Sequence, residues 1–188
     1  MIEINTRDHF NYHGHLLPQE FRKRNIFYDF LTGISSVRHM IICQWIPKVL
    51  YCYSKLEPIP QFHNLYYLQV KYFSTLLQLL PAFLESCPNL KILSLVDIPY
   101  SEDPRQVDFT NVPQCLMSTL EYVEIKKWIT KDETGIIKLV NYFLENSAVL
   151  KKLTLSFKNP CITKQEAESC KKLLTSTKLS PTCQVIIE

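Results

Sequence analysis

The sequence is poor in glycine, with only three among its 188 residues. Phosphate-binding loops need closely spaced glycines, because their backbone must approach the phosphate oxygens. Gly14, Gly33 and Gly135 are too far apart to form a G-x-G-x-x-G or G-x-x-x-x-G-K loop. No G-x-S-x-G signature of a serine hydrolase occurs either. We therefore expect a protein without enzymatic activity.

The seven cysteines lack the spacing of a metal site or a disulfide framework, since no C-x-x-C pair occurs. They are Cys43, Cys52, Cys87, Cys115, Cys161, Cys170 and Cys183. Most lie in or beside apolar runs, where a free cysteine acts as a small buried hydrophobic residue. The sequence also shows no signal peptide and no stretch near 18 uncharged apolar residues. We expect a reduced intracellular location, in the cytoplasm or nucleus.

The sequence has little excess of charge of either sign, with 21 basic and 18 acidic residues and a net charge of +3. This balance is too small to predict nucleic acid or a membrane surface as a partner. The hydrophobic share of 46% is ordinary for a globular protein. The chain is therefore expected to fold.

What the sequence does contain is a repeated L-x-x-L-x-L pattern, clearest at Leu90, Leu93 and Leu95. We call each copy a rung. The other four rungs are Val37/Met40/Ile42, Leu65/Leu68/Val70, Leu120/Val123/Ile125 and Leu150/Leu153/Leu155. Their first positions are 28, 25, 30 and 30 residues apart, at or just above the upper end of the leucine-rich-repeat period. The pattern predicts an α/β solenoid whose units bury their apolar faces against one another.

Helices are predicted between the rungs. Residues 18–34 place Phe27, Phe30, Leu31 and Ile34 at helical spacing, and Gly33 marks the end of that helix. Three later helices are indicated by T-x-x-E or T-x-x-Q capping boxes, whose side chains satisfy free backbone donors. These are Thr75/Gln78, Thr130/Glu133 and Thr163/Glu166. Pro81 should kink the first of the three or disturb its first turns.

Other segments are expected to be extended or irregular. Prolines 47, 58 and 60 argue against a long helix between residues 45 and 62, where we expect a short extra strand or a connector. Residues 2–4 and 185–187 have the apolar pattern of strands, and residues 100–111 form the longest loop. Alternating strands and helices imply parallel strands joined by right-handed crossovers. We expect strands on the concave side and helices on the convex side.

The positions between the buried ones predict a binding surface. In each rung, the third, fifth and seventh positions should point to the concave side. From the first rung to the last they are His39/Ile41/Cys43, Tyr67/Gln69/Lys71, Ile92/Ser94/Val96, Tyr122/Glu124/Lys126 and Lys152/Thr154/Ser156. The residues predicted to bind a protein are Tyr67, Gln69, Lys71, Ile92, Ser94, Val96, Tyr122, Glu124, Lys126, Lys152 and Thr154.

Tyr67, Ile92 and Tyr122 would form an apolar stripe bordered by Lys and Glu, as at many protein interfaces. Two other arrangements remain open. Neighbouring strands could pair these side chains across the sheet, or the loop at 100–111 could cover them.

A histidine cluster near the start is the one candidate metal site. His9, His13 and His15 form H-x-x-x-H-x-H, which could place two imidazoles one helical turn apart. The surrounding Asn11, Tyr12 and Gly14 indicate a loop. A solvated turn is favoured, and no metal or cofactor is expected. A metal-dependent enzyme is the alternative.

From about Asn25 to its end, the chain resembles plant F-box/FBD/LRR-repeat proteins. The blocks that carry the FBD resemblance are Pro113–Leu116, Leu120–Lys126, Val140–Ser147, Val149–Leu155 and Thr182–Val185. Residues 83–91 are similar to the repeat just ahead of the FBD. The resemblance implies a leucine-rich-repeat region at 1–112 and an FBD domain at 113–188 that continues the same solenoid.

In function, the resemblance implies a protein-protein interaction module that recognises substrates for a cullin-based ubiquitin ligase. The family docks the ligase adaptor through an N-terminal F-box, whereas Leu17-Pro18 here is an isolated dipeptide. We therefore expect an unidentified target protein as the partner and no direct binding of the adaptor. The alternative is a truncated remnant with no binding partner of its own.

Overall fold

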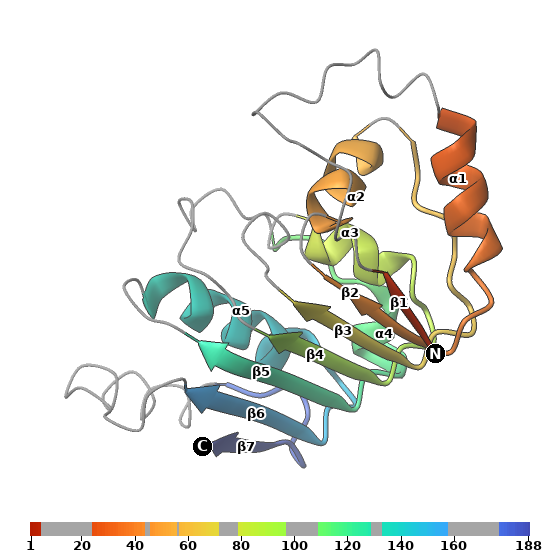
Figure 1. Cartoon of the computed structure of the whole chain (residues 1–188). Helices are drawn as coiled ribbons and strands as arrows, with labels where there is room; N and C mark the ends of the chain where they lie inside the picture. The colour runs from red at the N-terminus through yellow and green to blue at the C-terminus, as the bar shows by residue number, and fades with distance from the viewer. Residues whose placement is uncertain are drawn as a thin grey trace.

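A computed structural model describes residues 1–4, 24–43, 46–55, 57–71, 79–96, 109–128, 133–157 and 177–188. Seven parallel strands form one sheet, in which the strand order is the chain order (Figure 1). They are β1 (Ile2–Ile4), β2 (His39–Ile42), β3 (Tyr67–Lys71), β4 (Ile92–Val96), β5 (Tyr122–Trp128), β6 (Lys152–Phe157) and β7 (Gln184–Ile187). The helices in the described part are α1 (Arg24–Gly33), α2 (Ile46–Ser54), α3 (Leu80–Glu85), α4 (Gln114–Ser118) and α5 (Glu133–Asn146).

The strand register confirms the five predicted rungs. The fourth positions pair in successive strands as Met40, Leu68, Leu93, Val123 and Leu153, and the sixth as Ile42, Val70, Leu95, Ile125 and Leu155. All ten side chains are at most 1% exposed. Both predicted terminal strands extend these two rows, because β1 pairs with β2 and β7 with β6 in the same register.

One hydrophobic cluster joins the strands to the helices. The rung side chains share it with Leu31 of α1, Leu50 of α2, Phe83 of α3, Leu116 of α4 and Phe143 of α5. The core therefore lies on one face of the sheet, where Figure 1 also shows the helices. The fold is α/β with a parallel sheet, an arrangement compatible with leucine-rich repeats.

A ladder of backbone hydrogen bonds connects the residues just before the strands. The N–H groups of Tyr66 and Tyr67 both donate to the carbonyl oxygen of Arg38, at 2.8 and 3.1 Å. The same arrangement recurs for Lys91 and Ile92 on Tyr66, Glu121 and Tyr122 on Lys91, and Lys151 and Lys152 on Glu121. We call Arg38, Tyr66, Lys91, Glu121 and Lys151 the entrance row.

The helix α1 ends at Gly33, as predicted, and Leu31 within it and Ile34 just after it are buried. Phe30 was predicted on the same apolar side but is 42% exposed. Successive helical residues are about 100° apart, so Phe30 lies at the edge of a stripe centred nearer Leu31 and Ile34. The predicted start near Pro18 lies outside the described residues.

The predicted strand or connector after Trp45 is wrong, because α2 occupies Ile46–Ser54. Pro47 lies in the first helical turn, where a missing N–H breaks no helical hydrogen bond. The helix buries Leu50 and Tyr53 in the core.

Pro81 has the same first-turn position in α3, which begins at Leu80 and ends next to the predicted Ser86. The helix α4, which follows Pro113, was not predicted. Of the capping-box residues, Glu133 begins α5. Thr75, Gln78, Thr130, Thr163 and Glu166 lie outside the described residues.

Candidate functional site

The outer face of the sheet, opposite the hydrophobic core, carries the third, fifth and seventh rung positions in three rows. The aromatic row is His39, Tyr67, Ile92, Tyr122 and Lys152. The polar row is Ile41, Gln69, Ser94, Glu124 and Thr154. The basic row is Lys71, Val96, Lys126 and Ser156. The parallel register thus brings together residues that are 25 to 30 positions apart in the sequence.

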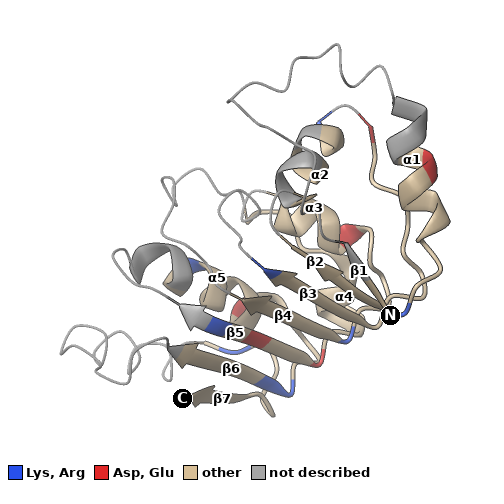
Figure 2. Cartoon of the chain, viewed as in Figure 1, with Lys and Arg blue, Asp and Glu red and all other residues tan. Residues whose placement is uncertain are grey.

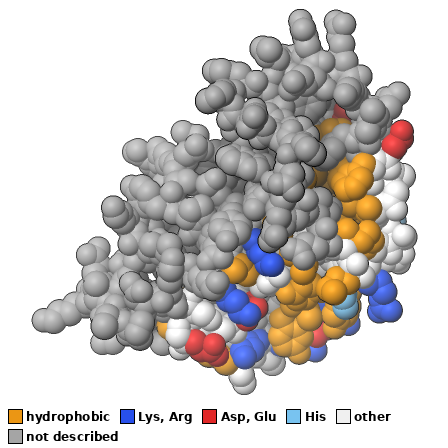
Figure 3. Space-filling view, viewed as in Figure 1, with side chains coloured by type: hydrophobic (Ala, Val, Ile, Leu, Met, Phe, Trp, Pro, Cys, Tyr) orange, Lys and Arg blue, Asp and Glu red, His pale blue; other side chains and the backbone are white. Residues whose placement is uncertain are grey.

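The aromatic row presents apolar surface. Tyr122 is 39% exposed, and Tyr67 and Ile92 are half-buried. The ring of His39 lies edge-on to Tyr67, with centroids 5.9 Å apart. Hydrophobic side chains gather beside a histidine and several lysines near the lower edge of Figure 3. This mixture of partly exposed aromatic and charged groups is typical of an interface core with a polar rim.

The polar row is a chain of hydrogen bonds across three strands. Gln69 Nε2 donates to Ser94 Oγ at 3.4 Å, and Ser94 Oγ donates to Glu124 Oε2 at 3.1 Å. The other carboxylate oxygen of Glu124 lies 2.8 Å from Lys126 Nζ. Pairing across strands, one of the alternatives to a binding surface, therefore holds for this row.

The expectation of an exposed surface is wrong for three residues of the predicted set. Ser94, Val96 and Thr154 are buried, with 0, 7 and 7% exposure. Each is a short side chain, and Ser94 and Val96 lie between longer ones at the same register position of strands about 4.8 Å away. The remaining eight, which are half-buried or exposed, are Tyr67, Gln69, Lys71, Ile92, Tyr122, Glu124, Lys126 and Lys152.

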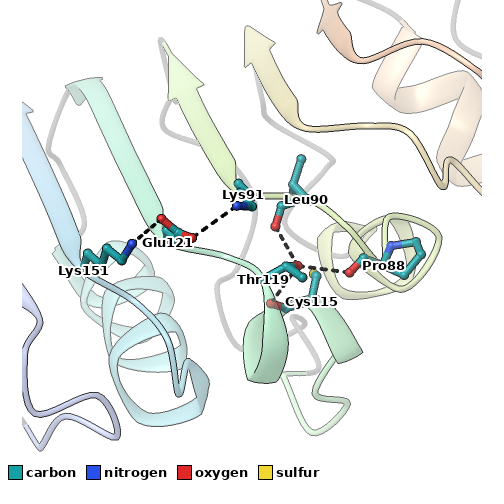
Figure 4. Close-up of polar contacts among 7 residues, drawn as sticks. All are labelled: Pro88, Leu90, Lys91, Cys115, Thr119, Glu121 and Lys151. Carbon is teal, nitrogen blue, oxygen red and sulfur yellow. Dashed lines mark hydrogen bonds and ion pairs between the residues drawn. The ribbon is translucent and has the colours of Figure 1, made fainter.

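The entrance row adds charges that the sequence analysis missed. Glu121 bridges two lysines, with 3.5 Å from Oε1 to Lys91 Nζ and 2.7 Å from Oε2 to Lys151 Nζ (Figure 4). The hydrogen bond from Lys151 lowers the pKa of Glu121 and raises the pKa of Lys151. Lys91 Nζ also lies 5.9 Å from the ring centroid of Tyr66, a cation–π distance. The sequence did contain a signal for this bridge, because the second rung positions Lys91, Glu121 and Lys151 alternate in charge at 30-residue steps.

The Thr119 hydroxyl fixes the chain where it enters β5. Its oxygen lies 2.9 Å from the carbonyl oxygen of Leu90, 3.0 Å from that of Pro88 and 3.4 Å from that of Cys115 (Figure 4). A hydroxyl carries one proton, so these carbonyls share a single donor. These contacts join two consecutive units two residues before Glu121 in the sequence, and so help to position Glu121.

The end of the predicted long loop is attached to α5. Phe109 stacks on Tyr142, with ring centroids 4.7 Å apart, and the Tyr142 hydroxyl donates to the Asn111 carbonyl oxygen at 2.8 Å. Burial raises the pKa of Tyr142 well above its ordinary value. Residues 100–108, which were predicted as a possible cover of the outer face, lie outside the described residues.

No group of three or more His, Cys, Asp or Glu side chains in the described ranges could hold a metal ion. His9, His13 and His15 lie outside those ranges. Burial raises the pKa of Cys115 to about 12 and that of Cys87 well above its ordinary value, so both thiols are protonated at neutral pH. In the same part of the chain, every helix is too short or too polar to cross a membrane.

Comparison with known proteins agrees with the resemblance. Residues 106–155 match the FBD family. An F-box/FBD/LRR-repeat protein of Arabidopsis thaliana is 59% identical over 185 residues, covering 98% of this chain and 40% of the relative. Another from the same organism is 51% identical over 188 residues, covering 100% of this chain and 42% of the relative.

Three further Arabidopsis thaliana relatives, whose names also contain F-box and FBD, are 60 or 61% identical. This chain spans 39 to 48% of their length. No solved structure matches the chain. The FBD match and the identity over nearly the whole chain show that it belongs to the plant F-box/FBD/LRR-repeat protein family.

Proposed function

We propose that the chain is a protein-protein interaction module that holds a target protein on the outer face of its sheet. The observation that carries this proposal is the aromatic row, in which Tyr67, Ile92 and Tyr122 stand side by side and are partly exposed. Aromatic side chains supply much of the binding energy of protein interfaces, because they bury a large apolar area at small entropic cost.

The architecture we propose around this face is a leucine-rich-repeat solenoid. Its strands line the concave side and its helices the convex side, as the rung pattern predicts. Seven parallel strands in chain order, with one core on one face, support this arrangement. A concave wall of strands offers a partner one continuous surface built from several units.

The biological role we propose is recognition of a substrate for an F-box-type ubiquitin ligase, in the cytoplasm or nucleus. The names of the relatives, which combine F-box, FBD and LRR repeat, support this role. The relatives are more than twice as long as the aligned chain. For the aligned chain we propose neither direct binding of the ligase adaptor nor enzymatic activity.

The proposal can be tested by capturing target proteins on the tagged chain in plant cell extract and measuring each interaction again with purified components. We expect Tyr67→Ala with Tyr122→Ala to weaken a captured interaction by at least about tenfold, since aromatic residues at the centre of an interface contribute about 2 kcal/mol or more. Tyr28→Ala is the matched control, because Tyr28 is 47% exposed on α1, away from this face.

Circular dichroism of each variant should show an unchanged fold. A double variant that binds every captured protein as well as the wild type does would contradict the proposal. Failure of the wild-type chain to bind any purified candidate would favour the alternative of a remnant without a partner.

A further inference from the structure

The outer face and the entrance row are more basic than the chain as a whole. Between residues 38 and 156, the described side chains of these rows include six cations and two carboxylates, a net charge of +4 against +3 for the full sequence (Figure 2). The cations are Arg38, Lys71, Lys91, Lys126, Lys151 and Lys152, and the carboxylates are Glu121 and Glu124. Positive charge is therefore concentrated where the proposed partner binds.

Both carboxylates are already neutralised within the protein. Glu121 is shared by Lys91 and Lys151, and Glu124 is bound by Lys126. Within the described ranges, no carboxylate lies within 4.0 Å of the side-chain nitrogen of Lys71 or Lys152. The exposed Arg38 of the entrance row also has no carboxylate partner among the described residues. Three cations can therefore pair with charges from outside, and two of them, the half-buried Lys71 and Lys152, lie on the outer face.

Lys152 ends the aromatic row, and Lys71 lies in the basic row. Lys152 follows Tyr122 in the aromatic row, on the adjacent strand β6. Lys71 is on β3, four residues after Tyr67, which is about 13 Å along the strand. Three inter-strand steps separate β3 from β6, about 14 Å. The diagonal between the two backbone positions is therefore about 20 Å. It crosses β4 and β5 and passes closest to Tyr122 in the aromatic row, whereas Tyr67 lies off it, straight along β3 from Lys71.

We propose that the target protein binds this face through an extended acidic segment, an inference that rests on the proposed function. An apolar side chain of the segment contacts Ile92 and Tyr122, and carboxylates on either side of it pair with Lys71 and Lys152. An extended chain advances about 3.3 Å per residue, so about six residues span the diagonal. The partner motif is thus a short stretch with an apolar centre and Asp or Glu near both ends.

Nucleic acid is less well suited to the same charges. A continuous phosphate backbone would pass close to Glu121 and Glu124, which lie among the lysines. A peptide places its carboxylates at separate positions and can present polar groups to the Gln69–Ser94–Glu124 chain. The observations therefore favour an acidic protein segment.

The test begins with selection of random peptides, about twelve residues long so that they can span the diagonal, on the purified chain. We expect the selected peptides to be enriched in Asp and Glu on both sides of an apolar residue. Fluorescence anisotropy then measures the Kd of one labelled peptide for the wild type, for Lys71→Glu with Lys152→Glu, and for the control Lys138→Glu. Lys138 is an exposed lysine on α5, outside the three outer-face rows.

We expect the double charge reversal to weaken peptide binding by at least about tenfold, and the control to bind as the wild type does. Replacing the acidic residues of the peptide by Asn and Gln should produce a similar loss. Raised salt should weaken binding of the wild type more than that of the double variant.

The possible outcomes separate this inference from the proposed function. Peptides without acidic enrichment, whose binding depends on Tyr67 and Tyr122, would overturn the inference and leave the proposed function standing. Peptides whose binding is unaffected by changes in either pair, or no selected peptide at all, would overturn both. Tight binding of a labelled single-stranded RNA that depends on Lys71 and Lys152, without peptide binding, would replace the acidic segment by nucleic acid.

Discussion

The two ends of the sheet share one strand register but differ in the length of their elements. The strands β5 and β6 have seven and six residues, whereas β2 has four. The helix α5 has 14 residues, whereas α2 has nine and begins with a proline in its first turn. The strands β5 and β6 and the helix α5 are therefore longer in the part of the chain that contains the FBD match, although the β5–β6 register shifts between Lys126 and Trp128.

Side-chain contacts between units also differ along the chain. Thr119 links β5 to the unit of β4, Glu121 links three units through Lys91 and Lys151, and Ser180 Oγ donates to the Leu150 carbonyl oxygen at 2.7 Å. Between β2 and β3, the described contact across the outer face is that of the His39 ring with Tyr66 and Tyr67. Polar side chains also link earlier units, since Gln69 donates to Ser94, Ser86 to the Ile59 carbonyl oxygen and Asn89 to the His63 carbonyl oxygen. The backbone ladder thus sets the register throughout, and the ion pairs of the entrance row are added in the C-terminal half.

The largest expected effect comes from creating equivalent cavities in the two halves. Leu153 and Met40 occupy the same register row and are both buried. Leu153→Ala should lower the free energy of unfolding by about 2 to 5 kcal/mol, because a cavity replaces buried side-chain atoms. Met40→Ala should cost less than Leu153→Ala, since the short strand β2 can relax more around the cavity.

Urea denaturation of both variants measures the difference. Native-state hydrogen exchange should also show faster opening of β2 than of β6 in the wild type. Equal costs for the two substitutions, together with equal exchange rates, would remove the proposed difference between the halves.

A smaller effect is expected at the link behind β5. Thr119→Val removes the donor that serves the Leu90 and Pro88 carbonyl oxygens and leaves the side-chain volume nearly unchanged. It should lower the free energy of unfolding by about 1 to 2 kcal/mol, because it leaves a partly buried acceptor unsatisfied. Thr119→Ser keeps the hydroxyl and should retain most of this stability. A serine variant as unstable as the valine variant would show that packing of the methyl group matters more than the hydrogen bond.

The smallest expected effect concerns the ion pairs of the entrance row. The pKa of Glu121 is lowered from 4.5, chiefly by the hydrogen bond from Lys151, so the ionised form is favoured in the folded state. Its contribution to stability is therefore fully present above pH 4.5 and is lost as the pH falls through the lower, folded-state pKa. Glu121→Gln should lower the melting temperature at pH 7 by no more than about 2 °C, because the pair is partly exposed and screened.

The same difference in melting temperature should shrink in acid. Thermal unfolding at pH 7 and near pH 3 checks this, with Glu145→Gln on the exposed surface of α5 as the control. A Glu121 effect that is as large in acid as at neutral pH would show that the charge of the carboxylate is not its cause.

Much of the core could be predicted from sequence, because burial imposes the same apolar pattern on every unit. Leu90, Leu93 and Leu95 showed the L-x-x-L-x-L pattern most clearly, and the other rungs were found because the same pattern recurs every 25 to 30 residues. The helix α2 could not be found in this way, because Pro47 breaks a helix only when it lies beyond the first turn. The sequence shows that a proline is present but not where the helix begins.

The outer face was predicted only in part, for a different physical reason. Period-two alternation gives the side of the sheet to which a residue points, but not its depth. Ser94 and Thr154 are buried because they are short and their neighbours are long, which depends on strands 25 to 32 residues away. The bridge from Glu121 to two lysines likewise depends on register, which had to be known before the charges could be paired.

The ladder of the entrance row gives the chain a particular tolerance to change. Each unit is attached to the next through carbonyl oxygens and N–H groups that every residue except proline can supply. Replacement of the outward-facing side chains, such as Tyr67 or Tyr122, leaves these bonds intact. Related chains could therefore acquire new partners by exchanging a few surface residues, and a designer could redirect recognition in the same way without rebuilding the fold.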